Sequence, residues 1–177
     1  MNDLLLLYAG VKPRQPGRSG HLSFLLSQLG AHAAMRFAQL LAPLGLSPPH
    51  SGILRALQQS SGMSQQQLAS LLRLHPSRLV ALVDELEARG LAERRESPDD
   101  RRSHALQVTE QGRKMLAEIH RIGAKHQDEL CAALDAKERE QLALLLERIA
   151  NQQGLTPGVH PGFSRLGNMG KKDKEEP

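Results

Sequence analysis

Two short helical patterns that follow each other closely constrain the fold of this chain more than any other feature. Ser64-Gln65-Gln66-Gln67 is a capping-box pattern, in which the serine caps a helix and the last glutamine reaches back to it. That helix is barely two turns long, because Leu74-His75-Pro76 breaks the pattern. Pro76 then opens a longer helix that ends at Gly90. Two short helices joined by a tight turn predict a helix-turn-helix motif.

The residues after Gly90 change to the pattern of a β-hairpin. An extended segment, Leu91-Ala92-Glu93-Arg94-Arg95, is followed by a charged turn, Ser97-Pro98-Asp99-Asp100-Arg101-Arg102, and then by the alternating segment His104-Ala105-Leu106-Gln107-Val108. A short hairpin directly behind a helix-turn-helix is typical of a wing.

Further amphipathic helices are predicted on both sides of this region. One covers residues 21–42, and a short one starts at Ser47-Pro48. Thr109 caps a helix that runs to Leu134, and Asp135 caps a last one. Aromatic residues make up 2% of the 177 residues and there is no Trp, which favours a core of packed helices. The predicted fold class is mainly α with a small β-hairpin wing.

Glycine and proline gather at both ends of the chain. Residues 1–20 are therefore predicted to be an N-terminal arm, and residues 153–177 a flexible C-terminal tail that ends in a charged run. The folded body is expected between residues 21 and 152.

The formal net charge of +4 is a mild indication of a polyanionic partner, and its distribution is more informative. Residues 21–72 contain Arg36, Arg55 and no acidic residue. Residues 73–109 carry seven Arg against seven Asp or Glu, which cancel. Any binding of nucleic acid must therefore depend on where individual arginines point.

Several classes of protein are disfavoured. The one cysteine, Cys131, excludes an intrachain disulfide and a multi-thiolate metal site. The apolar run Leu4–Leu7 is too short for a signal peptide or a transmembrane helix, so we expect a cytoplasmic protein that has no membrane partner. Hydrolase, zinc-protease and nucleotide-binding motifs are missing, and His120 and His126 are badly spaced to share a metal ion. We expect no enzymatic activity, no metal and no cofactor.

The order of the predicted elements and four local strings resemble the MarR (multiple antibiotic resistance regulator) family of bacterial winged-helix transcription factors, over about residues 21–152. The strings are Leu44-Gly45-Leu46-Ser47-Pro48, Leu82-Val83-Asp84-Glu85-Leu86-Glu87-Ala88-Arg89-Gly90-Leu91, Asp100-Arg101-Arg102 and Val108-Thr109-Glu110-Gln111-Gly112. Each is weak alone, but together and in this order they are specific.

The resemblance implies a six-helix fold that forms a homodimer. Residues 21–42 and 110–152 would be the dimerisation helices, and residues 47–109 a winged-helix lobe that binds double-stranded DNA at a pseudo-palindromic operator. Independently, an apolar stripe on the last helix favours a dimer or, alternatively, an ordinary intrachain core. The stripe consists of Leu142, Leu145, Leu146 and Ile149.

Readout of bases requires side chains near the N-terminus of a helix in the major groove. The segment Pro76-Ser77-Arg78 is placed for this, with Ser77 as a donor to phosphate or base and Arg78 as a bidentate partner of guanine. A solvated surface arginine is the alternative. His75, Val80, Ala81 and Glu85 depart from the family pattern, and phosphates would repel Glu85 unless it faces a partner such as Arg89.

The wing carries the sharper signal. By resemblance, Arg102 enters the minor groove and Asp100 orients it, while Arg101 contacts phosphate. A narrow groove concentrates negative potential, which suits a guanidinium held by a carboxylate. An ordinary charged turn is the alternative.

Two further pairs of residues are candidates for DNA binding. Of Arg94 and Arg95, strand alternation directs one toward DNA or the second helix of the motif and the other away, without indicating which. Ser64 and Gln65 either bind phosphate at a helix N-terminus or serve in capping alone.

In relatives a ligand site lies where the first, second and fifth helices meet, and Ser51 stands where many of them have a bulky aromatic residue. We expect a cavity there with a few cationic or hydrogen-bonding groups, suited to a small aromatic or carboxylated effector. The candidate residues are His32, Arg36, His50, Ser51 and Arg55. Closer helix packing without a cavity is the alternative.

The leading hypothesis is a homodimeric DNA-binding transcriptional regulator, a repressor that a small molecule releases from its operator. The alternative is a winged-helix protein-interaction module without operator binding, for which Val80, Ala81 and Glu85 are the indications. A small enzyme is disfavoured by the missing motifs.

Overall fold

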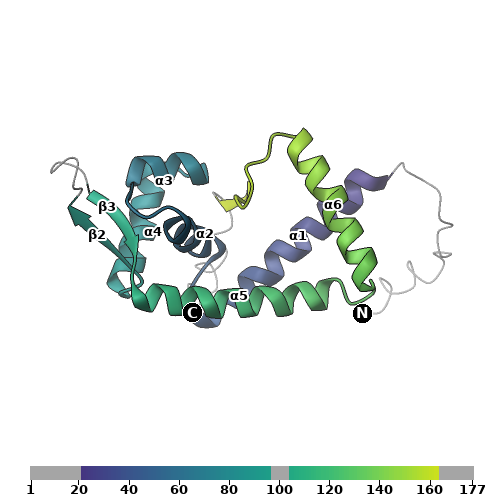
Figure 1. Ribbon diagram of the computed structural model, residues 1–177, viewed down its shortest axis with the longest axis horizontal. Coiled ribbons are helices and arrows are strands. Elements are labelled where there is room, and N and C mark those ends of the chain that lie inside the picture. Colours follow the sequence, from purple (N-terminus) through teal and green to yellow (C-terminus); the bar gives the residue numbers. More distant parts are fainter. Residues whose placement is uncertain (1–20, 97–103, 164–177) are drawn as a thin grey trace, which may run out of the picture. The chain divides into compact units, whose positions relative to one another are not determined.

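The computed structural model describes residues 21–96 and 104–163 (Figure 1). The chain divides inside its first helix into two units, one that ends at His32 and one that begins at Ala33, and the fold below is that of the second. The elements in chain order are α1 (Leu22–Leu41), the short 3-10 helix η2 (Ala42–Leu44), α2 (Pro48–Gln59), β1 (Met63–Ser64), α3 (Gln65–Leu72), α4 (Pro76–Ala88), β2 (Ala92–Glu96), β3 (His104–Val108), α5 (Glu110–Leu130) and α6 (Ala136–Gln152). The mainly α fold with a small sheet is confirmed.

Side-chain caps start the helices at the predicted positions. At α3 the Ser64 hydroxyl accepts from the Gln67 backbone N–H at 3.2 Å, and the Gln67 side chain accepts from the Ser64 N–H at 2.9 Å. Asp135 and Glu138 make the same reciprocal pair at α6. Thr109 accepts from Gly112 at the start of α5. The predicted C-terminal ends of the helices are less accurate, since α5 ends at Leu130 rather than at Leu134.

A left-handed residue makes the turn between α3 and α4. Arg73 has φ of 52°, and the Leu74 N–H donates to the Ala69 carbonyl at 2.9 Å, which closes the end of α3. His75 stands at the N-cap position of α4 without a side-chain capping hydrogen bond, and Pro76 occupies the first helical position, where its missing N–H costs nothing. The predicted helix-turn-helix is therefore present.

The wing belongs to a three-stranded antiparallel sheet with the order β1-β3-β2. Arg94 of β2 and Met63 of β1 both pair with Leu106 of β3, which is fully buried. The hairpin of β2 and β3 agrees with the prediction. The strand β1 was not predicted, because two residues carry no periodicity.

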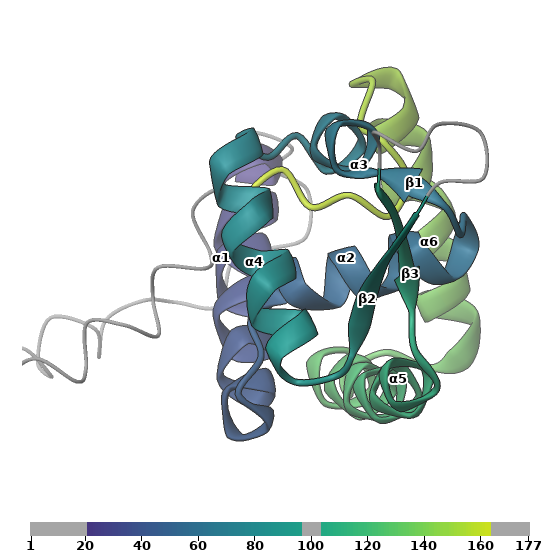
Figure 2. The ribbon, with the colours of Figure 1, turned by 90° about the vertical axis from the view of Figure 1, so that its left-hand side faces the viewer.

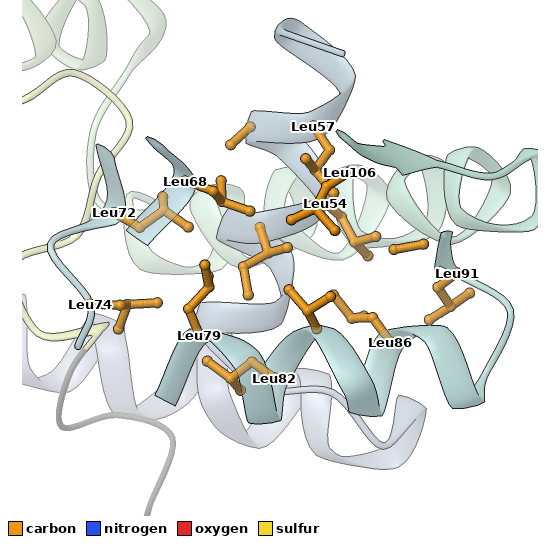
Figure 3. Packing of buried hydrophobic residues seen from close by; sticks show 14 of the residues in the cluster. Leu54, Leu57, Leu68, Leu72, Leu74, Leu79, Leu82, Leu86, Leu91 and Leu106 are labelled. Carbon is orange, nitrogen blue, oxygen red and sulfur yellow. The ribbon is translucent and has the colours of Figure 1, made fainter. Parts of the chain in front are cut away.

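Leucines of α2, α3, α4 and the sheet form the core, and Figure 3 shows them converging between α2 and α4. Leu54, Leu79 and Leu106 are completely buried, so truncation of one of them to alanine would cost about 2–5 kcal/mol of stability. Gly112 lets α5 approach the sheet, since a Cβ there would lie 2.0 Å from the Leu91 carbonyl oxygen. The view in Figure 2 shows α4 and α5 beside the hairpin and α2 behind it.

Residues 153–163 differ from the predicted flexible tail. The Phe163 side chain is 5% exposed and belongs to the core cluster, and Val159 packs against that cluster. Burial of a phenylalanine contributes about 1.5–3 kcal/mol toward holding a segment whose glycines and prolines indicate a coil. The prediction used composition, which does not report one well-placed aromatic contact.

Helix α6 leaves its apolar stripe uncovered. Leu142, Leu145, Leu146 and Ile149 are each 39–46% exposed, and α6 has no buried residue. Among the residues that the structure describes, none of the helices has both the length and the apolar character needed to cross a membrane.

Candidate nucleic-acid interface and ligand cavity

The N-terminus of α4 presents the residues predicted to read bases. Pro76 and Ser77 are exposed, and Arg78 is half-buried. The Ser77 hydroxyl lies 2.8 Å from His75 Nδ1, so the histidine ring orients it. The outer face of α4 continues with Val80, which is 37% exposed.

Arg94 fastens the wing to α4. Its guanidinium contacts the Asp84 carboxylate at 2.7 Å and also pairs with Glu87, whose other oxygen accepts from the Arg94 backbone N–H at 2.7 Å. With its carbonyl oxygen turned toward Arg94, the Gln65 amide accepts from Nε and Nη2, both at 2.7 Å. We call this arrangement of Arg94, Asp84, Glu87 and Gln65 the Arg94 clamp. It joins β2, α4 and α3, and its one positive charge offsets one of the two negative charges of Asp84 and Glu87.

The clamp separates the roles of the two strand arginines. Arg94 points toward α4 and its side chain is 22% exposed, whereas the Arg95 side chain is 61% exposed and lies 2.6 Å from Glu93. Strand alternation predicted this division without its direction. The partners of Arg94 were missed, although Asp84 and Glu87 have the spacing that places two carboxylates on one helix face.

Glu85 pairs with His50 and not with Arg89. Glu85 Oε2 lies 3.1 Å from His50 Nε2, while the Arg89 guanidinium donates to the carbonyls of Gly45 at 2.8 Å and Leu44 at 2.7 Å. His50 is 5% exposed, and its Nδ1 accepts from the Ser47 N–H at 3.1 Å. Burial lowers the pKa of His50, although the nearby Glu85 carboxylate raises it.

The remaining candidates for DNA binding fall into two groups. The Ser64 hydroxyl serves as a helix cap and Gln65 faces Arg94, so both have structural partners. Asp100, Arg101 and Arg102 lie outside the described residues.

A cavity of about 600 Å³ lies in the unit that begins at Ala33. Its walls include Phe37 of α1, Ser51 and Arg55 of α2, and Leu116 and Ile119 of α5. The Ser51 hydroxyl donates to the Pro48 carbonyl at 2.8 Å. Thus α1, α2 and α5 enclose space where the sequence predicted it.

The predicted ligand residues are distributed unevenly around this cavity. Ser51 and Arg55 line it. Arg36 and His50 do not: Arg36 contacts Gln39 on the surface of α1, and His50 is used by Ser47 and Glu85. His32 belongs to the preceding unit. Within the described residues, no three His, Cys, Asp or Glu side chains are grouped to hold a metal ion.

A helix-turn-helix followed by an antiparallel hairpin that is fastened to its second helix is a winged helix, a class of DNA-binding domain. Residues 44–103 match the sequence profile of the MarR family. The chain is 33% identical over 140 residues to a Thauera aromatica protein assigned to transcriptional regulation of the hcr operon, covering 78% of this chain and 84% of that protein.

Solved structures with the same fold include two complexes with DNA. The transcriptional repressor CouR, bound to a DNA duplex, has 33% identity and a TM-score of 0.65, with 77% of this chain and 99% of that chain covered. A MarR-family protein of Mycobacterium tuberculosis in complex with DNA has 26% identity and a TM-score of 0.64, with 72% and 96% covered. The chain belongs to the MarR family, and it is a DNA-binding transcriptional regulator rather than an enzyme.

Proposed function

We propose that this regulator is a cytoplasmic homodimeric repressor that binds a pseudo-palindromic operator and leaves it when a small aromatic or anionic effector binds. The Arg94 clamp is the observation that carries the DNA-binding part. Arg94 pairs with Asp84 and Glu87, which offsets one of their two negative charges, and it holds the wing against α4. Pro76, Ser77 and Arg95 stay exposed on the same lobe.

The proposed DNA contacts follow from this arrangement. Ser77 and Arg78 read base edges in the major groove, Arg95 and Arg101 contact phosphates, and Arg102, oriented by Asp100, enters the minor groove. Arg94, Ser64 and Gln65 position these elements rather than bind bases. CouR, a repressor with 33% identity, supports the assignment as a repressor.

The uncovered stripe of α6 supports the homodimer. Large apolar side chains that a single chain leaves exposed along one helix are typical of an interface between copies. A two-fold dimer matches the symmetry of a pseudo-palindromic operator. The cavity supports the effector, since Arg55 is its one Arg or Lys and no acidic residue lines it within the described part of the chain.

A gel-shift titration tests the proposal. The duplex is the DNA upstream of the protein's own gene, and a shuffled duplex of equal length is the control, each at low and at high salt. We expect the upstream duplex to be preferred at both salt concentrations, and the absolute affinity to fall as salt rises. If both duplexes bind equally and high salt abolishes the binding of both, the protein-interaction module is favoured instead.

A further inference from the structure

Residues 155–163, which we call the C-terminal strap, form an ordered segment after α6. The Leu155 N–H donates to the Ala150 carbonyl at 3.0 Å, which ties the start of the strap to α6. Two turns follow, with Val159 N–H to Thr156 carbonyl at 3.1 Å and Phe163 N–H to His160 carbonyl at 3.0 Å. Figure 1 shows the strap leaving α6 and returning to α2.

The strap has two anchors on one face of α2, and each uses a glycine. The Phe163 ring packs on Gly52, where a Cβ would lie 2.7 Å from ring atom Cε2. The Arg55 guanidinium donates through Nη2 to the Gly158 carbonyl. Gly158 has φ of +73°, which a residue with a side chain rarely adopts. Gly52 and Arg55 are three residues apart, so both anchors hold the same side of the helix.

The docked strap completes the wall of the cavity. Five of its fifteen lining residues come from the strap, and they include His160 and Phe163. The Phe163 ring fills the space above Gly52 and leaves the cavity of about 600 Å³ between α1, α2, α5 and the strap. Without the strap this space would lose these five residues from its wall.

The chemistry of the enclosed space selects an anion with an apolar body. Arg55 has a planar guanidinium with five N–H donors, and its bond to Gly158 fixes the plane of that group at the cavity wall. Phe37 and Phe163 supply apolar surface from α1 and from the strap. A carboxylate on Arg55 would therefore place an aromatic ring against both.

We propose that the C-terminal strap is an integral part of the effector site, and that an aromatic carboxylate binds between Arg55 and the strap when Phe163 is docked on Gly52. This inference rests on the proposed ligand-responsive function. The strap also borders a second cavity of about 260 Å³ that Leu71 and Leu72 of α3 line. A ligand that keeps the strap docked therefore also fixes a segment that lies next to α3 of the helix-turn-helix.

Calorimetric titration of the full chain with salicylate and with naphthoate tests this proposal, with benzamide as the uncharged analogue. Gly52→Ala displaces the Phe163 ring by its Cβ, and Phe163→Ala removes the ring. Gln58→Ala is the control on the same helix, because the Gln58 side chain is exposed and lines neither cavity. Hydrogen exchange of residues 155–163 reports docking of the strap in every variant.

We expect both strap variants to lose at least about tenfold in carboxylate affinity and to exchange faster over the strap, and Gln58→Ala to match the parent. Unchanged carboxylate affinity in both strap variants would overturn the role of the strap and leave the regulator with its effector intact. If no carboxylate binds the parent while the upstream DNA still binds, the effector is contradicted together with the strap, and the DNA-binding function stands.

Discussion

At the scale of single residues, His50 shows how a candidate for ligand binding can instead be committed to the fold. Its Nδ1 accepts from the Ser47 N–H, so the ring proton must sit on Nε2, which faces the Glu85 carboxylate. Burial disfavours a second proton more than Glu85 favours it, and the nearby Arg89 and Arg78 disfavour it further. His50 is therefore a neutral link between α2 and α4.

A pH dependence of stability follows from His50. The unfolded chain protonates this histidine near its ordinary pKa of 6.5, while burial lowers the pKa in the folded protein. The unfolded state thus binds more protons below pH 6.5, and the free energy of unfolding falls as the pH falls through that value. We expect His50→Gln, which keeps an acceptor for the Ser47 N–H, to lose less stability on acidification.

Urea unfolding of both proteins at about pH 7.5 and about pH 5.5 measures the difference. Burial also lowers the pKa of His160, but that contribution is common to both proteins and cancels. Parallel losses of stability in parent and variant would show that His50 does not carry the effect.

At the scale of elements, the Arg94 clamp determines how the wing and α4 are presented together. Arg94 of β2 reaches Asp84 and Glu87 of α4 and Gln65 of α3, and it is mostly buried there. Removal of the guanidinium would leave Glu87, whose side chain is 27% exposed, without its main partner. The clamp should therefore matter for stability, and for DNA binding only indirectly.

Arg94→Ala and Arg95→Ala form a matched pair that separates positioning from contact. We expect Arg94→Ala to cost about 1–3 kcal/mol of unfolding free energy and to weaken operator binding without changing its salt slope. Arg95→Ala should change stability by less than about 0.5 kcal/mol and reduce the salt slope by about 1. Denaturant unfolding and anisotropy titrations at several salt concentrations measure both, and the reverse pattern would contradict the assignment.

The wing tip provides an independent prediction. Arg102→Ala should cost about 1–3 kcal/mol of operator affinity, the usual size of a lost groove contact, and leave the thermal midpoint unchanged. Binding to the upstream duplex by anisotropy and a thermal melt measure the two effects. Operator affinity equal to that of the parent would exclude a groove contact by Arg102.

The elements differ in how far they could be predicted, and distance along the chain explains the difference. Ser64 with Gln67 and Asp135 with Glu138 are three residues apart, so their caps can be recognised locally. The pairing of β1 with β3 joins residues about forty positions apart and involves two residues, too few for a pattern. Phe163 on Gly52 spans more than one hundred positions, and its glycine-rich surroundings indicate a coil.

The site shows the same limit. Strand alternation left open whether Arg94 or Arg95 points toward the second helix of the motif, because the partners on α4 appear only when β2 is placed against that helix. Ser51 and Arg55 were predicted to line a cavity, and they do so. Both are half-buried and lie next to the buried apolar residues of α2, whose pattern the sequence shows. The strap residues that complete the cavity could not be predicted from composition.

At the scale of the whole molecule, the proposed homodimer depends on the stripe of α6. Leu145→Glu places a charge on a side chain that is 46% exposed in the single chain, so folding of the chain should tolerate it while an apolar interface should not. We expect the parent to sediment at twice the 19.4 kDa chain mass and the variant to sediment as the single chain and to lose operator binding. A variant that stays dimeric would place the interface elsewhere.

Footprinting of the DNA upstream of the gene tests most directly whether this protein is a dimeric winged-helix regulator. We predict two protected half-sites related by a two-fold axis and about one helical turn apart, each with major-groove protection from α4 next to minor-groove protection from the wing. Protection that is absent, or that spreads without symmetry over any duplex, would contradict operator binding by such a dimer.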